Sequence, residues 1–549
     1  MSEDAVHGQQ SRGYADGSVI GQVLGGITRL YPVPPTSTTA LLVAGALLGA
    51  VGDALLRAPG PPGLNLSLWI ALVAVAAVAL QRRAGLTRDR ERLGWLATGV
   101  LFAAGLTWRD APPLKLLALG CATLTFALSA HRLAAAWVRR AGVLRYAGAL
   151  VLGAIHAWTA AALAIVDVAR FAPSVQTSRL MAWRRGAAVA RGLVIAAPLL
   201  LVFGALFMSA DAVFAELVSS VLTFDFGRLA GHIVLFSVGA WLSTGYLRSF
   251  LTGTDLPLAS RGQAIDGRGV PTVKRPTLGI TEVATALATL DLLFLLFVIV
   301  QYRYLFGGDT LVQITANLTY ADYARRGFFE LVFAVVLVVP VLLAAEWLLG
   351  RGTRRDTVVF RGLAGVQIVL VLAIAASAFQ RLRLYYASYG LTESRFYAMV
   401  LLLWVAAILF WLAATVLRGR RDLFGCGALV SGLGTVALLF VVNPDGIVAR
   451  ANVARMASAD APVRFDVAYA TSLSADAVPV LIDGLSALPG DVQCPLARHM
   501  LRRWAPDRGH SIRSWNWSAS RARDAVRKHE ASLRSMVGPG QECASALIR

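Results

Sequence analysis

The chain has little charge for its length and lacks the sequence motifs that mark the common enzyme classes. Charged residues make up only 15% of its 549 positions, whereas 57% are hydrophobic and the mean hydropathy is +0.62. We find no P-loop, no HExxH motif and no nucleophile elbow, so we predict no catalytic residue. An ordinary soluble enzyme is excluded, because so much apolar surface must face lipid.

Cysteine and histidine are also scarce. The seven His show no paired spacing, and no cluster of Cys and His suggests a metal site or another cofactor. Of the four cysteines, Cys121 and Cys426 fall in apolar stretches, whereas Cys494 and Cys543 fall in the polar C-terminal region. The last two form a candidate disulfide in an oxidising compartment, with free thiols as the alternative. Residues 1–30 are polar and glycine-rich, so we expect no cleavable signal peptide.

Long apolar stretches are the strongest signal that is present. Each approaches or exceeds the roughly 17 to 25 residues that a membrane-spanning helix needs once its flanks are included, and residues 93–107 are the least secure. They predict an all-α, polytopic transmembrane helix bundle of about 11–13 spans with a small helical extracytoplasmic C-terminal domain. The stretches are residues 36–56, 64–80, 93–107, 114–130, 147–166, 193–208, 233–247, 280–300, 328–349, 358–379, 396–417 and 424–442.

Clusters of arginine lie at the ends of most of these apolar stretches. The formal net charge is +20, but arginines at the ends of spans serve as orientation signals and contacts to anionic headgroups, so we expect no nucleic-acid partner. Short basic loops stay cytoplasmic, which places residues 82–92, 132–145, 248–275, 351–355 and 418–421 inside. Residues 170–191 are equally basic, although a full span at 147–166 would put them outside. An odd total of about eleven spans satisfies the charges and leaves the region after residue 442 outside.

Two passages on the predicted outer side combine Arg and Tyr, against the tendency of Arg to stay inside. We interpret their likeness as a tandem repeat of one helical hairpin, in which parallel copies bring both clusters to one interface. The first passage holds Arg303, Tyr320, Tyr323, Arg325, Arg326 and Glu330. The second holds Arg381, Arg383, Tyr386, Tyr389, Glu393 and Arg395.

This Tyr/Arg cluster has two interpretations. Guanidinium groups bind phosphate or carboxylate bidentately, and Tyr supplies hydroxyl donors and flat faces, so the cluster suits a lipid headgroup or a sugar. Alternatively, the Tyr residues are an ordinary interfacial belt and the Arg residues pair with Asp322, Glu330 or Glu393 to fasten helix ends.

Two ionisable residues fall within predicted spans. Asp291 lies about half-way along an apolar stretch, where a carboxylate must be protonated, paired or in contact with water. His156 stands mid-span beside Trp158 and is a candidate for a proton relay, with a hydrogen bond to a neighbouring helix as the simpler alternative.

Several strings resemble a known family. They include Ser209-Ala210-Asp211, the run from Tyr320 to Leu331, the run from Tyr386 to Tyr397, and Asn443-Pro444-Asp445. On these the sequence is similar, over residues 191–527, to uncharacterised bacterial polytopic membrane proteins of the domain-of-unknown-function 4153/4173 type. The resemblance implies a bacterial inner (cytoplasmic) membrane location and transfers no activity or catalytic residue. It divides the chain into a polar cytoplasmic segment (1–35), a variable N-terminal transmembrane region (36–191), a family-like transmembrane core (192–442) and the extracytoplasmic domain (443–549).

Three functions stay open. The leading one is a non-catalytic cell-envelope protein that binds an anionic membrane lipid or an envelope protein partner through the Tyr/Arg cluster. The alternative is a proton-coupled secondary transporter that uses Asp291 and His156. A third is a membrane enzyme acting on a lipid-linked substrate, with Asp322, Glu330 and Glu393 as acid/base carboxylates.

Overall fold

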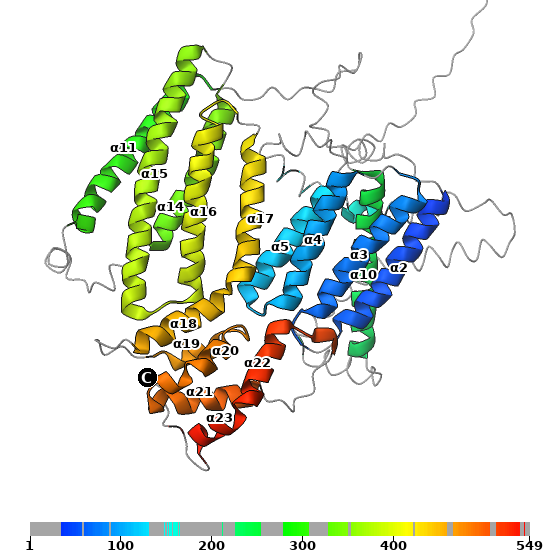
Figure 1. Ribbon diagram of the computed structural model, residues 1–549. Coiled ribbons are helices and arrows are strands. Elements are labelled where there is room, and N and C mark those ends of the chain that lie inside the picture. The colour runs from blue at the N-terminus through cyan, green and yellow to red at the C-terminus, as the bar shows by residue number, and fades with distance from the viewer. Residues whose placement is uncertain are drawn as a thin grey trace, which may run out of the picture.

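Two bundles of long helices and a C-terminal helical domain make up the computed structural model (Figure 1). Within the residues that it describes, nine helices are long and apolar enough to cross a membrane. The predicted all-helical, multi-span architecture with a C-terminal helical region is therefore confirmed. The described residues are 35–57, 60–86, 89–130, 226–253, 278–306, 328–349, 353–420, 423–457, 465–504 and 512–538, with residues 211 and 543 and single positions between 146 and 164.

Five helices of the first bundle are described over their full length. They are α2 (Pro35–Leu56), α3 (Leu64–Arg83), α4 (Arg90–Trp108), α5 (Pro112–Ala130) and α10 (Phe226–Thr252). Helix α4, the least secure of the predicted spans, is not among the nine candidates. It nevertheless lies between α3 and α5, and its charged start is anchored because buried Arg92 donates to the carbonyl oxygens of Ser129 and Phe250.

Glycine spacing explains the closest helix pair in this bundle. Helix α2 carries Gly45 and Gly49 four residues apart, on the face toward α10. A Cβ atom on Gly49 would lie 2.7 Å from the carbonyl oxygen of Phe236, and one on Gly45 would overlap the hydroxyl of Thr244. Small residues at this spacing let helix backbones approach where lipid provides no hydrophobic drive for association.

The second bundle is built around one apolar core. Its helices are α11 (Ile280–Phe306), α14 (Phe328–Leu348), α15 (Arg354–Tyr389), α16 (Glu393–Thr415) and α17 (Phe424–Val442). Val335, Val371 and Leu409 are fully buried or nearly so in that core. The two bundles lie side by side in Figure 1 and meet where Leu439 and Phe440 of α17 pack against α4 and α5.

The C-terminal domain lies across one end of both bundles (Figure 1). Only Asn443, in a left-handed conformation with φ of 57°, separates α17 from α18. The domain comprises α18 (Pro444–Ala457), α19 (Val467–Ser472), α20 (Val478–Asp483), α21 (Gly490–Arg503), α22 (Trp517–Lys528) and α23 (Glu530–Val537). These helices share their own core, which includes Val448, Leu496 and Val526.

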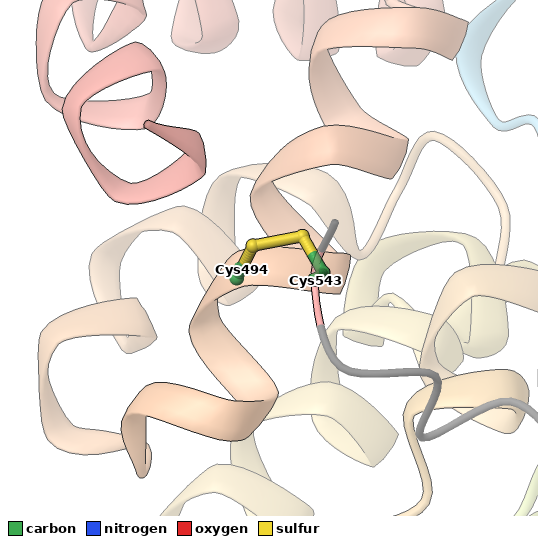
Figure 2. The surroundings of a disulfide bond; sticks show 2 residues. All are labelled: Cys494 and Cys543. Carbon is green, nitrogen blue, oxygen red and sulfur yellow. A yellow bond between two sulfur atoms is a disulfide. The ribbon is translucent and has the colours of Figure 1, made fainter. Parts of the chain in front are cut away.

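A disulfide ties the end of the chain to this domain. Cys494 of α21 is bonded to Cys543, with a Cα–Cα distance of 5.7 Å (Figure 2). The two cysteines that the sequence offered as a candidate pair are thus brought together. Cys121 and Cys426 are free.

The described parts of the basic loops that the sequence predicts to be cytoplasmic lie at the end of the helices opposite to the C-terminal domain. Helices α3, α10 and α16 run toward that end and finish beside Arg82, Arg248 and Arg418. Helix α5 ends there too, whereas α10 begins at the domain end, so the chain changes ends between residues 130 and 226. The basic loop at 170–191, on which the predicted span count depends, lies outside the described residues.

Candidate functional site

Much of the first predicted Tyr/Arg passage falls on residues that the structure does not describe. Tyr320, Tyr323, Arg325 and Arg326 lie outside the described residues, as does the side chain of Arg303 in the last turns of α11. His156 lies outside them as well. Glu330 is described and is exposed in the first turn of α14. The predicted meeting of the two passages therefore stays a prediction.

The second passage divides between two different environments. Arg381 of α15 is buried and donates to Oε1 of Gln301 at 2.5 Å, an oxygen that also accepts from the hydroxyl of Ser377 at 3.2 Å. These hydrogen bonds join α15 to α11. Arg383, two residues later, is exposed. These two arginines lie apart from the rest of the passage.

The remainder of the passage gathers at the turn between α15 and α16, against the C-terminal domain. Gly390 ends α15 with φ of 80°, a conformation that glycine adopts without strain. Asn452 of α18 holds this turn through two hydrogen bonds to the backbone of Leu391. Its Oδ1 accepts from the amide of Leu391 at 2.8 Å, and its Nδ2 donates to the Leu391 carbonyl at 2.8 Å. Tyr386 packs against the core of the domain.

A cavity of about 200 Å³ opens at this turn, and we name it the junction cavity. Arg395 lines it from α16, donating to the Gly390 carbonyl while its guanidinium lies 4.0 Å from the centre of the Tyr385 ring. Arg455 lines it from α18, close enough that a Cβ on Gly390 would lie 3.0 Å from its Nη1. The other polar residues of the lining are Tyr389, Thr392, Asn452, Asp466 and Tyr469.

A buried group of carboxyls lies beside this cavity. Glu393 donates its backbone N–H to the hydroxyl of Tyr469 at 2.6 Å. Its carboxyl lies within hydrogen-bonding reach of that of Asp445, which is fully buried in the first turn of α18. Burial, together with the negative charges of Glu393 and Asp445, raises the pKa of Tyr469 to about 12.

Three oxygen atoms of this group are buried without a hydrogen-bond partner among the described residues. They belong to the carboxyls of Glu393 and Asp445 and to the hydroxyl of Tyr397. The other oxygen of Asp445 accepts from the amide of Ser474 at 3.1 Å. Because buried polar atoms are nearly always paired, such a group requires an explanation.

A second polar contact joins the C-terminal domain to the turn between α4 and α5. Arg109 donates to Asp476 at 3.2 Å and to the carbonyl oxygen of Phe440 at 2.7 Å. Asp476 also accepts from the amides of Asp110 and Ala111 at 2.7 and 3.1 Å, and from the hydroxyl of Ser518 at 2.5 Å. Both oxygens of this buried carboxylate are satisfied.

Asp291 is buried in α11, 7% exposed, and both of its carboxyl oxygens lack a partner within the described part of the chain. Helices α11 and α15 run in the same direction, with Gln301 beside Ser377. Ten residues earlier on each helix stand Asp291 and Gln367. This register places Asp291 level with Gln367, whose buried Oε1 is also without a partner among those residues.

Asp445, Arg455, Tyr469 and Asp476 belong to the site, but no sequence pattern indicated a role for them. Asp445 and Asp476 were visible only as single carboxylates in a polar region, where ion pairing with solvent-exposed Arg is the ordinary expectation. Nothing in their spacing showed that folding would bury them beside helices α16 and α4. Within the described residues, no group of three or more His, Cys, Asp or Glu is arranged to hold a metal ion.

Comparison with known proteins gives a family but no relative of known activity. Residues 96–484 match the family described as Domain of unknown function (DUF4153). The search of curated proteins and the search of solved structures gave no match.

The matched region corrects the expected limits of the resemblance. It begins at residue 96, within α4, and not near residue 191, so part of the N-terminal bundle belongs to it. It contains the α4–α5 and α15–α16 turns and ends after α20, before the helices that carry and follow Cys494. The match covers well over half of the 549 residues, and this multi-span membrane protein belongs to the DUF4153 family.

Proposed function

We propose that this membrane protein is non-catalytic and binds an anionic group, the phosphate or carboxylate of a lipid headgroup, in the junction cavity. The observation that carries the proposal is the convergence of Arg395 from α16 and Arg455 from α18 on one cavity beside Tyr389. In this proposal the protein lies in a bacterial inner membrane with its C-terminal domain outside. The anion then joins the membrane bundle to that domain.

The chemistry of the lining supports an anion. Arginine presents a planar fork of donors that matches phosphate and carboxylate, and one of the five N–H donors of Arg395 is used by Gly390. Tyr389 is 55% exposed at the end of a span, where Tyr commonly meets lipid headgroups. Asp466 also lines the cavity, but its carboxylate caps α19 by accepting from the amide of Tyr469 at 2.8 Å.

The size of the cavity limits the ligand. About 200 Å³ is below the roughly 300–1,000 Å³ typical of sites that enclose a drug-sized molecule. A headgroup or a free small anion fits this volume, whereas a whole lipid does not. Acyl chains would remain in the bilayer beside α15 and α16.

Native mass spectrometry of the detergent-purified protein tests the proposal. Wild type should retain phosphatidylglycerol over phosphatidylcholine, Arg395→Gln should lose this preference, and Arg383→Gln should keep it because Arg383 is exposed on α15 outside the cavity lining. Competition by inorganic phosphate without any lipid preference would identify a free anion as the ligand. Equal retention by wild type and Arg395→Gln, or a co-purifying protein lost with the variant, would contradict the headgroup proposal.

A second candidate function, a proton-coupled transporter, rests on Asp291. A buried carboxyl on a span, with no partner for either oxygen among the described residues, is the kind of residue that proton pathways use. In liposomes with an imposed pH gradient, a transporter would dissipate the gradient when its anion is added, and Asp291→Asn would not. No dissipation with any anion that binds would exclude this function. For the enzyme alternative, Glu330 is exposed, Asp322 lies outside the described residues, and no substrate-sized site joins them to Glu393 among those residues.

A further inference from the structure

Two carboxyl groups lie together beside the junction cavity, and neither has a donor for one of its oxygens. Asp445 is 0% exposed; one of its oxygens accepts from Ser474 and the other has no partner in the described structure. The buried Oε1 of Glu393 has none either. The two side chains are within hydrogen-bonding reach of each other.

A single proton shared by the two carboxyls would give both unpartnered oxygens a hydrogen bond. Two ionised carboxylates are acceptors only, so they cannot bond to each other, and their repulsion is stronger in a buried site than in water. If one of them is protonated, its O–H donates to the other and both unpartnered oxygens are satisfied. Carboxyl pairs that share a site commonly hold one proton in this way.

The unpartnered oxygens of Glu393 and Asp445 accept no hydrogen bond from a Lys or Arg side chain among the described residues. Asp476, another buried carboxylate of the domain, is already bonded to Arg109. The titratable and charged groups around the pair are Arg395 and Tyr397 on α16, Arg455 on α18, Tyr469 and Asp466 on α19, Asp476 before α20, and Arg109, Asp110 and Lys115 at the start of α5.

The pair is directly connected to the cavity wall. The Tyr469 hydroxyl that accepts from the Glu393 amide belongs to the cavity lining, and Arg395 stands two residues after Glu393 in the same helical turn. A doubly ionised pair therefore opposes the attraction of Arg395 and Arg455 for an anion. A pair that holds one proton carries half of that negative charge.

We propose that Glu393 and Asp445 share one proton and that the junction cavity binds its anion together with this proton. The inference rests on the proposed anion site and adds a proton-binding site to it. The proton neutralises one carboxyl, which reduces the negative charge beside Arg395 and Arg455, and the anion then binds to these two arginines. No covalent bond changes, because the proton is taken from water or buffer and returned when the anion leaves.

Proton-linked binding makes the apparent Kd for the anion depend on pH. If binding of one anion takes up one proton, the apparent Kd rises by up to about tenfold for each pH unit over the range in which the empty pair releases its proton. Glu393→Gln and Asp445→Asn each remove one negative charge and keep a donor in the pair. Both variants should bind the anion with the affinity of protonated wild type and without this pH dependence.

Isothermal titration calorimetry tests the coupling. Inorganic phosphate and dihexanoyl phosphatidylglycerol are titrated separately into detergent-purified full chain between pH 6 and pH 9, in two buffers with different ionisation enthalpies. We expect wild type to take up close to one proton per anion and the two variants to take up none. Glu330→Gln is the matched control, because Glu330 lies in the first turn of α14 as Glu393 does in α16, but it is exposed and should behave as wild type.

The outcomes separate the two proposals. Anion binding by wild type with no proton uptake overturns the shared proton and leaves the anion site standing. No binding of either anion by wild type at any pH overturns both. Proton uptake that persists unchanged in both variants places the proton elsewhere and overturns the assignment to this pair. The wild-type measurement in two buffers needs no variant, so it decides the coupling even if a substitution prevents folding.

Discussion

Two of the turns at which the C-terminal domain contacts the membrane bundles use similar residues in opposite ways. At the α4–α5 turn, Asp476 is buried and both of its oxygens accept hydrogen bonds, one of them from Arg109. At the α15–α16 turn, Asp445 is equally buried, yet one of its oxygens faces Glu393 and has no donor among the described residues.

The difference separates a structural contact from a functional one. A buried carboxylate with a full set of donors fixes the position of the domain on the bundle, and removing either partner leaves an uncompensated charge. A buried carboxyl without a donor reduces stability and persists only when something else depends on it. We therefore expect substitutions at the first turn to change folding, and substitutions at the second to change binding.

Asp476→Ala should have the largest effect on stability. It leaves Arg109 buried without its carboxylate, which typically costs about 3–5 kcal/mol of the free energy of unfolding. Denaturant titration of the detergent-purified protein, followed by tryptophan fluorescence, measures the loss. Asp445→Asn is the matched comparison and should change stability by less than about 1 kcal/mol. Equal losses in the two variants would contradict the distinction between the turns.

Cys494→Ser should have the next largest effect, confined to the C-terminal domain. The disulfide closes a loop of 49 residues, for which the chain-entropy estimate is about 4 kcal/mol and the usual observed range about 2–4 kcal/mol. Limited proteolysis should cut the variant within residues 485–549 while the bundles stay intact. Cys426→Ser, which removes a free cysteine of α17, is the control and should be cut like wild type.

Tyr469→Phe should have a smaller effect with a distinct pH dependence. It removes the acceptor of the Glu393 amide and should cost about 1 kcal/mol near pH 8. The folded pKa of about 12 lies above the ordinary value of 10.0, so the contribution of Tyr469 is present below pH 10 and is lost as pH rises from 10 through 12. The difference in melting temperature between wild type and the variant should therefore shrink above pH 10. Tyr389→Phe serves as the exposed control.

His499→Gln should have the smallest effect. Burial, and then the charge of Arg503, lower the pKa of His499 from 6.5, so the folded domain binds this proton less tightly than the unfolded chain. Its contribution is present above pH 6.5 and is lost as pH falls below that value. The fall in melting temperature from pH 8 to pH 5 should be smaller in the variant than in wild type. An equal fall in both proteins would show that His499 does not titrate in this range.

The sequence predicted the multi-span helical architecture and singled out three residues that lie at one turn of the structure. Tyr389, Glu393 and Arg395 stand out because Arg and Tyr are unusual together at an outer helix end, and the structure places them at one turn. Arg381 belongs to the same sequence passage, but it points to Gln301 on another helix. The pattern could not separate these roles, because the direction of a side chain depends on which helices pack around it.

The sequence by itself determined that this is a multi-span helical membrane protein, since the length and apolarity of a segment decide whether it can cross the bilayer. It also singled out the arginines and tyrosines that such a location makes unusual. Only the tertiary structure decided that Arg395 shares a cavity with Arg455, and that Glu393 faces Asp445 while Asp476 meets Arg109. The physical reason is that partnership between charges depends on distance and burial, and residues far apart in sequence come together only through packing.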